Sequence, residues 1–263
     1  MRRAVPLVSH LGYDVPFGHR QIWDRLTWAL EPAQLASAGV PAELEMRVRC
    51  TDVVRRGRRL AALTMHVEIS RDGRPLGVAT TRFASQAPAV YDRLRGAYAD
   101  VDHALSRVVA AAPPLAPHRV GRDRAHDVVL APTGEPNRYL LRFDVGHPVL
   151  FDHRVDHAPG MLLLEAARQA AHTVAHPDFA VITAMDTAFR RYVEFDAPCL
   201  VAAEALPSQL PTHVSSRVTA VQHGEEVFST TVTALRGPAS SAVLRGFCAP
   251  PRTGPGVRPP TRG

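Results

Sequence analysis

Residues 151–171 read FDHRVDHAPGMLLLEAARQAA, and this stretch decides the fold because it places a helix directly after a loop of ionisable side chains. Pro159 has the fixed φ that suits the first turn of a helix, so the sequence predicts a helix over 159–175. Apolar residues cover most of its circumference, which predicts that it is buried. Glu165 and Arg168 lie among Leu and Ala, so they are solvated, paired with each other, or used in chemistry.

Strands are predicted on both sides of this helix. Residues 42–50, AELEMRVRC, alternate strictly, with Leu44, Met46 and Val48 on one face, and this pattern is typical of a half-buried antiparallel strand. One buried helix among antiparallel strands predicts an α+β fold in which the sheet wraps the helix. The other stretches with strand patterns are 63–69, 75–84, 126–132, 139–145, 181–195, 199–206, 212–224 and 225–236.

Between the strand runs the period changes. Residues 90–111 predict one helix with a single apolar stripe, and the Pro-rich residues 112–118 predict a linker. The Pro, Gly and Arg residues of 249–263 predict a disordered tail. The stripe consists of Val90, Leu94, Tyr98, Val101, Leu105 and Val108.

The two halves of the chain echo each other. RRAVPLVSH at 2–10 is similar to RQAAHTVAH at 168–176, so that Arg2 matches Arg168. DGRPLGVATT at 72–81 is similar to HGEEVFSTT at 223–231, and in both a turn glycine precedes a strand. These matches predict an internal duplication.

Composition narrows the chemistry. The 263 residues are 46% hydrophobic and 21% charged, which is a globular composition, with a net charge of +6. All 31 basic residues are Arg, as GC-rich coding produces, and the missing lysine excludes Schiff-base and phosphate-loop lysine chemistry. The basic surface favours anionic partners, but no nucleic-acid-binding motif is present, so we expect no nucleic acid.

The cysteines and the apolar runs indicate the cellular location of the protein. Three scattered cysteines argue against a disulfide framework. No apolar run approaches the ~20 residues that span a bilayer, so we expect no membrane association. The first residues lack the pattern of a signal peptide, and we expect a cytoplasmic protein.

Glu165 and Arg168 are three residues apart on the predicted helix, so their side chains share one face. One interpretation is an ordinary intrahelical ion pair. The other follows from the apolar flanks and from Pro159-Gly160, which suit an approach of backbone N–H groups to a ligand. In that case Glu165 is a general base and Arg168 holds an anion.

The loop at 152–157 also has two interpretations. Its Asp and His side chains cap the helix, or they ligate a metal, because Asp and His recur at a spacing of four. Nothing else completes a ligand set, so we expect no metal and no cofactor. The sequence contains no Gly-x-Ser-x-Gly motif, which argues against a serine hydrolase. The run VVRRGRRL at 53–60 is interpreted as a solvated hairpin end or as a docking surface for an acidic carrier protein.

A family resemblance adds to these observations. Residues 120–171 and MDTAFRRYVEFDAPC at 185–199 closely resemble the second repeat of the A-factor biosynthesis (AfsA-type) proteins, which are γ-butyrolactone autoregulator synthases of actinomycetes. GYDVPFGHRQIWDRLTWAL at 12–30 resembles the stretch after the central helix of the first repeat. The resemblance extends from about residue 2 to 236.

The resemblance implies a double hotdog fold, in which each repeat wraps a long helix in an antiparallel sheet. It implies transfer of a β-ketoacyl group, presented by a carrier protein or coenzyme A, to dihydroxyacetone phosphate, followed by ring closure. At the matching positions Glu165 would accept the proton of the attacking hydroxyl, and Arg168 would hold the phosphate or the oxyanion. The residues expected to bind substrate are His153, Asp156, His157, Gly160 and Met161.

Related hotdog dehydratases share Pro159, Gly160 and Glu165, but their catalytic histidine falls on Phe151 here, which argues against dehydration. We expect a first repeat at 1–88, a helical linker at 89–118, a second repeat at 119–248 and the tail.

The first hotdog is expected to be incomplete, through a late start codon or a genuine shortening, because its early strands, its Asp/His loop and its Glu-x-x-Arg would precede residue 2. Its open sheet edge would favour self-association, such as a homodimer. Two alternatives to the synthase remain, a hotdog thioesterase that uses Glu165 with water and a non-catalytic chain that binds acyl thioesters.

Overall fold

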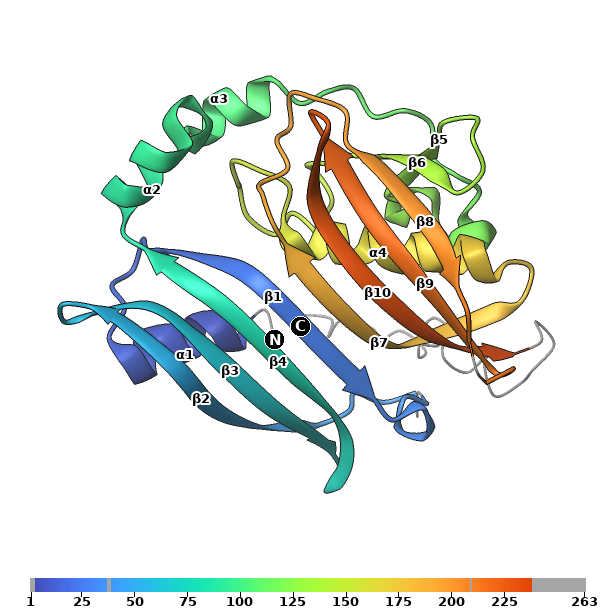
Figure 1. The fold of residues 1–263 in the computed structure, drawn as a ribbon, viewed down its shortest axis with the longest axis horizontal. Coiled ribbons are helices and arrows are strands. Elements are labelled where there is room, and N and C mark those ends of the chain that lie inside the picture. The colour runs from blue at the N-terminus through green and yellow to red at the C-terminus, as the bar shows by residue number, and fades with distance from the viewer. Residues whose placement is uncertain (1–2, 37–38, 209, 238–263) are drawn as a thin grey trace, which may run out of the picture.

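Ten antiparallel strands form one continuous sheet in the computed structural model, which describes residues 3–36, 39–208 and 210–237 (Figure 1). The first half of the chain supplies one helix and four strands, α1 (Ala4–Tyr13), β1 (Arg20–Leu30), β2 (Leu44–Arg56), β3 (Arg59–Arg71) and β4 (Arg74–Gln86). Two short helices follow, α2 (Pro88–Arg95) and α3 (Val101–Ser106). The second half supplies β5 (Leu130–Pro132), β6 (Arg138–Leu141), α4 (Gly160–Ala175), β7 (Phe179–Phe189), β8 (Leu200–Leu206), β9 (His213–Gln222) and β10 (Glu225–Gly237).

The strand order shows the duplication that the sequence predicts. The order is β2-β3-β4-β1-β7-β10-β9-β8-β6-β5, so each half arranges the four strands after its helix in the same way. The turns repeat as well, because Asp72-Gly73 and His223-Gly224 both have positive φ at both positions, as a two-residue hairpin of this type requires. The prediction of two related halves is therefore confirmed, although Arg2 lies outside the described residues.

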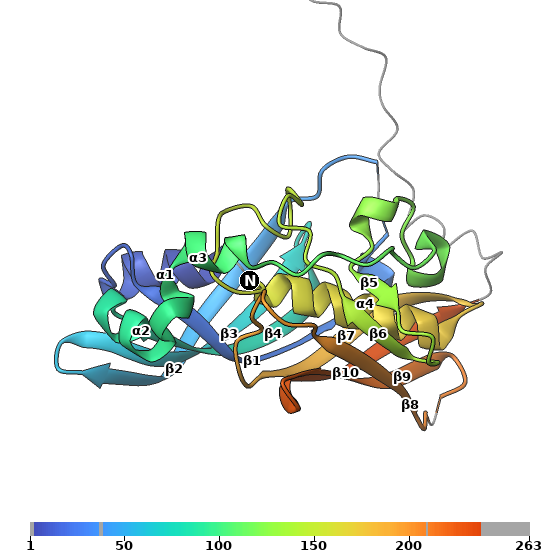
Figure 2. The ribbon, with the colours of Figure 1, turned by 90° about the horizontal axis from the view of Figure 1, so that it is seen from above.

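The halves meet where β1 pairs with β7, from Arg25 opposite Ala188 to Ala29 opposite Ala184. Figure 2 shows α1 and α4 on the same face of the sheet. The larger core surrounds α4, and a smaller one lies between α1 and strands β3 and β4. Trp28 of β1 packs against both cores, so the two hydrophobic clusters are joined at this seam.

The helix at the centre of the second half begins and ends as predicted, within one residue. Pro159 stands at its N-cap, and ten of its residues are buried, which confirms a buried helix. The prediction of one helix over 90–111 is wrong, because Gly96 takes a positive φ and ends α2. Leu94 of the predicted apolar stripe is 65% exposed.

Several predicted strands differ from the structure in length or burial. β5 and β6 are shorter than the runs at 126–132 and 139–145. β2 exists and alternates as predicted, but its apolar side chains Leu44, Met46 and Val48 are exposed, so it is not half-buried. These side chains lie on the same face of the sheet as the core residues of β3, but α1 does not extend far enough to cover them. In the described ranges, no strand pairs with the outer edge of β2, whereas β6 pairs with β8.

The described helices include none with the length and apolar character needed to cross a bilayer. The expected tail at 249–263 and the end of the second repeat at 248 fall outside the described residues.

Candidate active site

A cavity of about 940 Å³ opens at one end of the seam between the two halves. The first half contributes His19 to Asp24 at the start of β1, and the helix α2 contributes Tyr91. The second half contributes the loop before α4, the first turn of α4 and the segment from Phe189 to Glu194. All five predicted substrate-binding residues line this cavity, namely His153, Asp156, His157, Gly160 and Met161.

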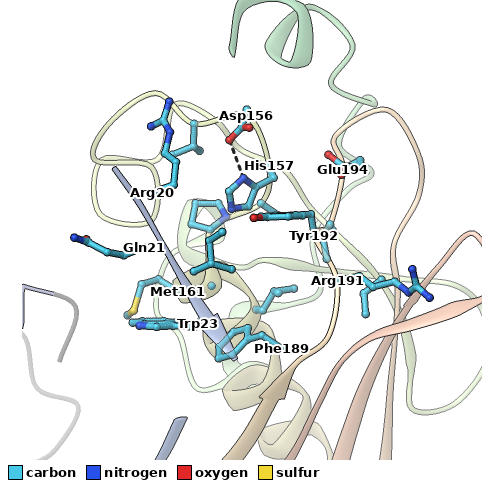
Figure 3. Close-up of a pocket in the computed structure, with 18 of the residues that line it drawn as sticks. Arg20, Gln21, Trp23, Asp156, His157, Met161, Phe189, Arg191, Tyr192 and Glu194 are labelled. Carbon is cyan, nitrogen blue, oxygen red and sulfur yellow. Dashed lines mark hydrogen bonds and ion pairs between the residues drawn. The ribbon is translucent and has the colours of Figure 1, made fainter. Parts of the chain in front are cut away.

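The floor of the cavity is apolar and is built across the seam. Trp23 of β1 lies 5.5 Å from Phe189 of β7 between ring centroids, and Met161 of α4 lies beside them (Figure 3). Gly160 fits under Trp23 because it has no side chain, and a Cβ there would lie 2.9 Å from the indole ring. The glycine is therefore required by packing across the seam, in addition to any backbone contact with a ligand.

Asp156 is a buried carboxylate with several partners. Its Oδ2 accepts a hydrogen bond of 2.5 Å from the hydroxyl of Tyr91, and its Oδ1 lies 2.8 Å from Nδ1 of His157. The guanidinium of Arg95, itself paired with Glu194, lies 3.5 Å from Oδ2. Burial alone would raise the pKa of Asp156, but His157, Tyr91 and Arg95 together lower it to about 2. Asp156 is thus ionised at neutral pH.

The ionised Asp156 orients His157. Because Oδ1 of a carboxylate only accepts, Nδ1 of His157 carries the proton and Nε2 keeps its lone pair. The ring also packs edge-on against Tyr192, with centroids 4.7 Å apart. His157 is partly exposed to the cavity, and no group in the described chain bonds to its Nε2 (Figure 3). This geometry suits a general base.

The first turn of α4 adds two hydrogen-bond donors. The amides of Gly160 and Met161 have no partner among the described residues, as expected at a helix N-terminus. No side chain caps this helix, so the interpretation of the loop as a cap is wrong. The carboxylate of Asp156 is bound instead to Tyr91 and Arg95.

Glu165 and Arg168 are paired in a different place. Arg168 donates to both carboxylate oxygens of Glu165, over 2.8 and 2.9 Å, and Arg122 forms a second pair with it at 2.7 Å. Gln169 donates a further hydrogen bond to Glu165. Burial would raise the pKa of Glu165, but these partners lower it. Neither Glu165 nor Arg168 lines the cavity, and their catalytic role stays a prediction.

Four residues at this site do not emerge from sequence reasoning. Tyr91 and Arg95 come from α2, Trp23 comes from β1, and Tyr192 follows β7. Each is distant in sequence from the loop at 152–157, and only the fold brings them together. One partial signal exists, since an Arg and a Tyr on one short helix suit a buried ion pair near an aromatic ring.

Among the described residues, no three His, Cys, Asp or Glu side chains lie close enough together to hold a metal ion. Asp156 and His157 are bound to each other and to Tyr91. Their geometry is that of a hydrogen-bonded dyad.

Two solved structures share the fold. The 12:0-ACP thioesterase from Umbellularia californica matches with a TM-score of 0.53 and 10% identity, over 90% of this chain and 84% of that chain. A MaoC-like dehydratase matches with a TM-score of 0.50 and 14% identity, over 89% of this chain and 81% of that chain. Because the identities are so low, these structural matches show the fold alone, which is of the hotdog type, as predicted.

Sequence comparison is more specific. The family model of the A-factor biosynthesis hotdog domain matches residues 1–85 and 103–236. The 2-oxo-3-(phosphooxy)propyl 3-oxoalkanoate synthase of Streptomyces virginiae is 42% identical over 87% of this chain and 76% of its own length. The protein of the same name from Streptomyces coelicolor is 40% identical over 92% of this chain and 74% of its own length. The chain therefore belongs to the AfsA family, with the double hotdog fold that its two halves form.

Proposed function

We propose that this protein joins a β-ketoacyl group to dihydroxyacetone phosphate in γ-butyrolactone biosynthesis. The name of the related synthases describes an ester between a 3-oxoalkanoate and the 2-oxo-3-(phosphooxy)propyl group, which is dihydroxyacetone phosphate joined through its free hydroxyl. The observation that carries the proposal is the Asp156–His157 dyad inside a cavity with an apolar floor. A hydroxyl nucleophile needs such a base, and an acyl chain needs such a floor.

The reaction needs one proton to move twice. Nε2 of His157 accepts the proton of the attacking hydroxyl while the oxygen of that hydroxyl forms a bond to the thioester carbonyl carbon. The tetrahedral intermediate then breaks its carbon–sulfur bond, and His157 returns the proton to the leaving thiolate. Asp156 stabilises the imidazolium that exists between the two steps, as a buried carboxylate on Nδ1 does in other acyl-transfer sites.

The remaining groups of the cavity match the rest of the substrates. The amides of Gly160 and Met161 stand at the positive end of α4, where they can donate to the oxyanion of the intermediate. The apolar floor of Trp23, Met161 and Phe189 suits the acyl chain. Arg20 lines the cavity and pairs with no carboxylate in the described ranges, so it is our candidate for the phosphate.

Glu165 remains the second candidate for the base. Arg122, Arg168 and Gln169 saturate its carboxylate, and it would have to leave them to reach the cavity. The same contacts explain it as the anchor of residues 117–122 against α4, since Arg168 also donates to the backbone oxygen of Val120.

The proposal is tested by thiol release from a β-ketoacyl thioester, measured with and without dihydroxyacetone phosphate while product masses are recorded. Release that requires the phosphate and yields the ester mass supports the synthase. Equal release without it, with free acid as the product, would identify a thioesterase. No release in either condition from a folded preparation would contradict both and leave an acyl-binding chain.

A further inference from the structure

The hairpin that joins β2 to β3 carries a dense cluster of exposed positive charge. We call residues 55–59, RRGRR, the basic hairpin. All of its side chains are exposed, and none of them pairs with a carboxylate among the residues that the structure describes. Other arginines of the first half are paired, such as Arg25 with Asp186 and Arg47 with Glu45. The basic hairpin therefore keeps its charge available to a partner.

The basic hairpin has a defined position on the fold. The guanidinium of Arg55 donates to the backbone oxygen of Arg58 and lies 5.8 Å from the ring centroid of Tyr13. These contacts fix the hairpin against the end of α1. The side chains of Arg56 and Arg58 make no such contact in the described structure, and both are exposed.

The cavity opens at the same end of the sheet. Across β4, Ala62 of β3 is level with Ile22 of β1, a residue that lines the cavity, so the two backbones are about 10 Å apart. His19 also lines the cavity, and its pKa is lowered mainly by burial and secondly by the nearby charge of Arg59. Figure 1 shows the hairpin, the start of β1 and α2 at this end. A molecule bound on the hairpin therefore lies at the end of the sheet where the cavity lies (Figure 1).

The shape of this surface indicates the class of partner. No residue of the basic hairpin belongs to the cavity, so its arginines do not enclose a small anion. Cations spread over an exposed turn are matched by an acidic protein face, which gains specificity and association rate from charge complementarity. A coenzyme A molecule would instead be expected to place its phosphates in a pocket.

We propose that the basic hairpin is the docking surface for an acidic acyl carrier protein, which delivers the β-ketoacyl thioester to the adjacent cavity. This inference rests on the proposed function, because that function supplies the need for a thioester donor. It adds the surface on which the carrier protein docks, so that the donor approaches over β2 and β3.

The test is the double charge reversal Arg56→Glu/Arg58→Glu, which leaves every cavity residue unchanged. The matched control is Arg119→Glu/Arg124→Glu, two exposed arginines of the second half that pair with no carboxylate in the described part of the chain. Each variant is assayed with a 3-oxooctanoyl group on a bacterial acyl carrier protein, on coenzyme A and on N-acetylcysteamine. Fluorescence anisotropy of a labelled, unacylated carrier protein measures docking without chemistry.

We expect the hairpin variant to raise the KM for the carrier-protein substrate and the Kd for the carrier by at least about ten-fold. The kcat should not change, the other two thioesters should react as before, and the control should match the parent. An unchanged Kd would overturn the proposal. So would an equal loss with coenzyme A, which would mean that the arginines hold its phosphates, or with N-acetylcysteamine, which would mean a damaged cavity. If no thioester is turned over, the proposed function fails while the anisotropy still decides the docking.

Discussion

Two carboxylates, Asp156 in the loop before α4 and Glu165 within α4, have opposite surroundings. Asp156 is held by Tyr91 and Arg95 and passes a hydrogen bond to an imidazole that faces the cavity. Glu165 is held by Arg122 and Arg168 and does not line this cavity. Both have lowered pKa values, and Asp156 is buried while Glu165 is partly buried. Only the first has a partner that can move a proton to a substrate.

Replacing His157 by Asn should lower kcat/KM by about 100-fold or more, because the amide cannot accept the hydroxyl proton. Replacing Asp156 by Asn should also lower it, since the imidazole loses the partner that fixes its tautomer. His103→Asn, at an exposed position on α3, is the control. Steady-state kinetics with a β-ketoacyl thioester measures the effect. Full activity of the His157 variant would remove this residue from the mechanism.

For Glu165→Gln the two interpretations give different results. If Glu165 is an anchor, the variant loses up to about 3 kcal/mol of stability, because Arg168 and Arg122 lose their carboxylate, while the folded enzyme keeps its turnover. If Glu165 is the base, turnover is abolished in a folded protein. Urea unfolding and kcat, measured together, separate the two. Glu135→Gln is the matched control, because Glu135 and Arg138 form an exposed pair with the same spacing.

For individual residues, the sequence predicted which side chains line the cavity but not the contacts that hold Asp156. The five residues expected to bind substrate all line the cavity, because they adjoin the first turn of one strongly patterned helix. The partners of Asp156 could not be predicted, since Tyr91 and Arg95 are more than sixty residues away in the chain. The sequence of a loop with several Asp and His residues does not indicate which of them will accept a hydrogen bond from a tyrosine far away in the chain.

Among the elements, α4 is the one whose first residue matters most. Its N-terminus touches the other half of the chain, because Gly160 lies against Trp23 of β1, and it also lies against Phe189 of its own half. The helix thereby joins two roles, holding the seam together and presenting its first amides to the cavity.

Gly160→Ala should therefore lower the free energy of unfolding by about 1–3 kcal/mol, the range typical of overpacking. Activity should fall as well, because Trp23 has to move from the cavity floor. The control is Gly12→Ala in α1, where the nearest atom to the new Cβ is 3.9 Å away and alanine favours the helix. Thermal unfolding of both variants measures the effect, and a Gly160 variant as stable as the control would contradict the close approach.

Element boundaries were predictable where apolar periodicity is strong and failed where one residue overrides it. The helix over 159–175 and the strands β9 and β10 agree with the structure, whereas the strand predicted at 181–195 already ends at Phe189. The stripe over 90–111 did not show that Gly96 would end the helix. Strict alternation identified β2, but alternation shows only which side chains share a face, not whether another element covers that face.

The whole molecule has a pH dependence set by buried groups. Burial, reinforced by the charge of Arg168, lowers the pKa of His172 to about 3. In an unfolded chain the value is near 6.5. Between these values the unfolded chain binds a proton that the folded protein does not. Stability is therefore full above pH 6.5, and as the pH falls below it each unit removes up to about 1.4 kcal/mol. Asp156 adds to this loss only below about pH 4, as the pH approaches its own lowered pKa.

Urea unfolding at pH 7.5, 6 and 5 checks this expectation. His172→Gln should flatten the dependence between pH 6 and 5, whereas His103→Gln, at an exposed position, should retain the parent slope. Equal slopes for parent and His172→Gln would show that another group carries the acid sensitivity.

The uncovered face of β2 also acts at the scale of the molecule. Met46 and Val48 are exposed on a strand whose outer edge is unpaired in the described chain, a combination that favours association. We expect this chain to self-associate at high concentration and Val48→Lys to reduce that tendency. Sedimentation velocity at several concentrations measures it, with Val78→Lys as the control, because Val78 on β4 is also exposed, at 56% against 37% for Val48. A parent that stays monomeric throughout would contradict the expectation.

The short helix α2 follows the last strand of the first half, yet its Tyr91 and Arg95 bind Asp156 of the second. This gives the chain a preferred point of recombination. A chimera of two relatives joined just before Pro88 inherits α2 together with Asp156, so the donors and their carboxylate have evolved together. A chimera joined at residues 107–116 separates them and relies on a foreign helix to hold the dyad. Functional hybrids of such proteins should therefore accumulate crossovers ahead of α2 and few behind it.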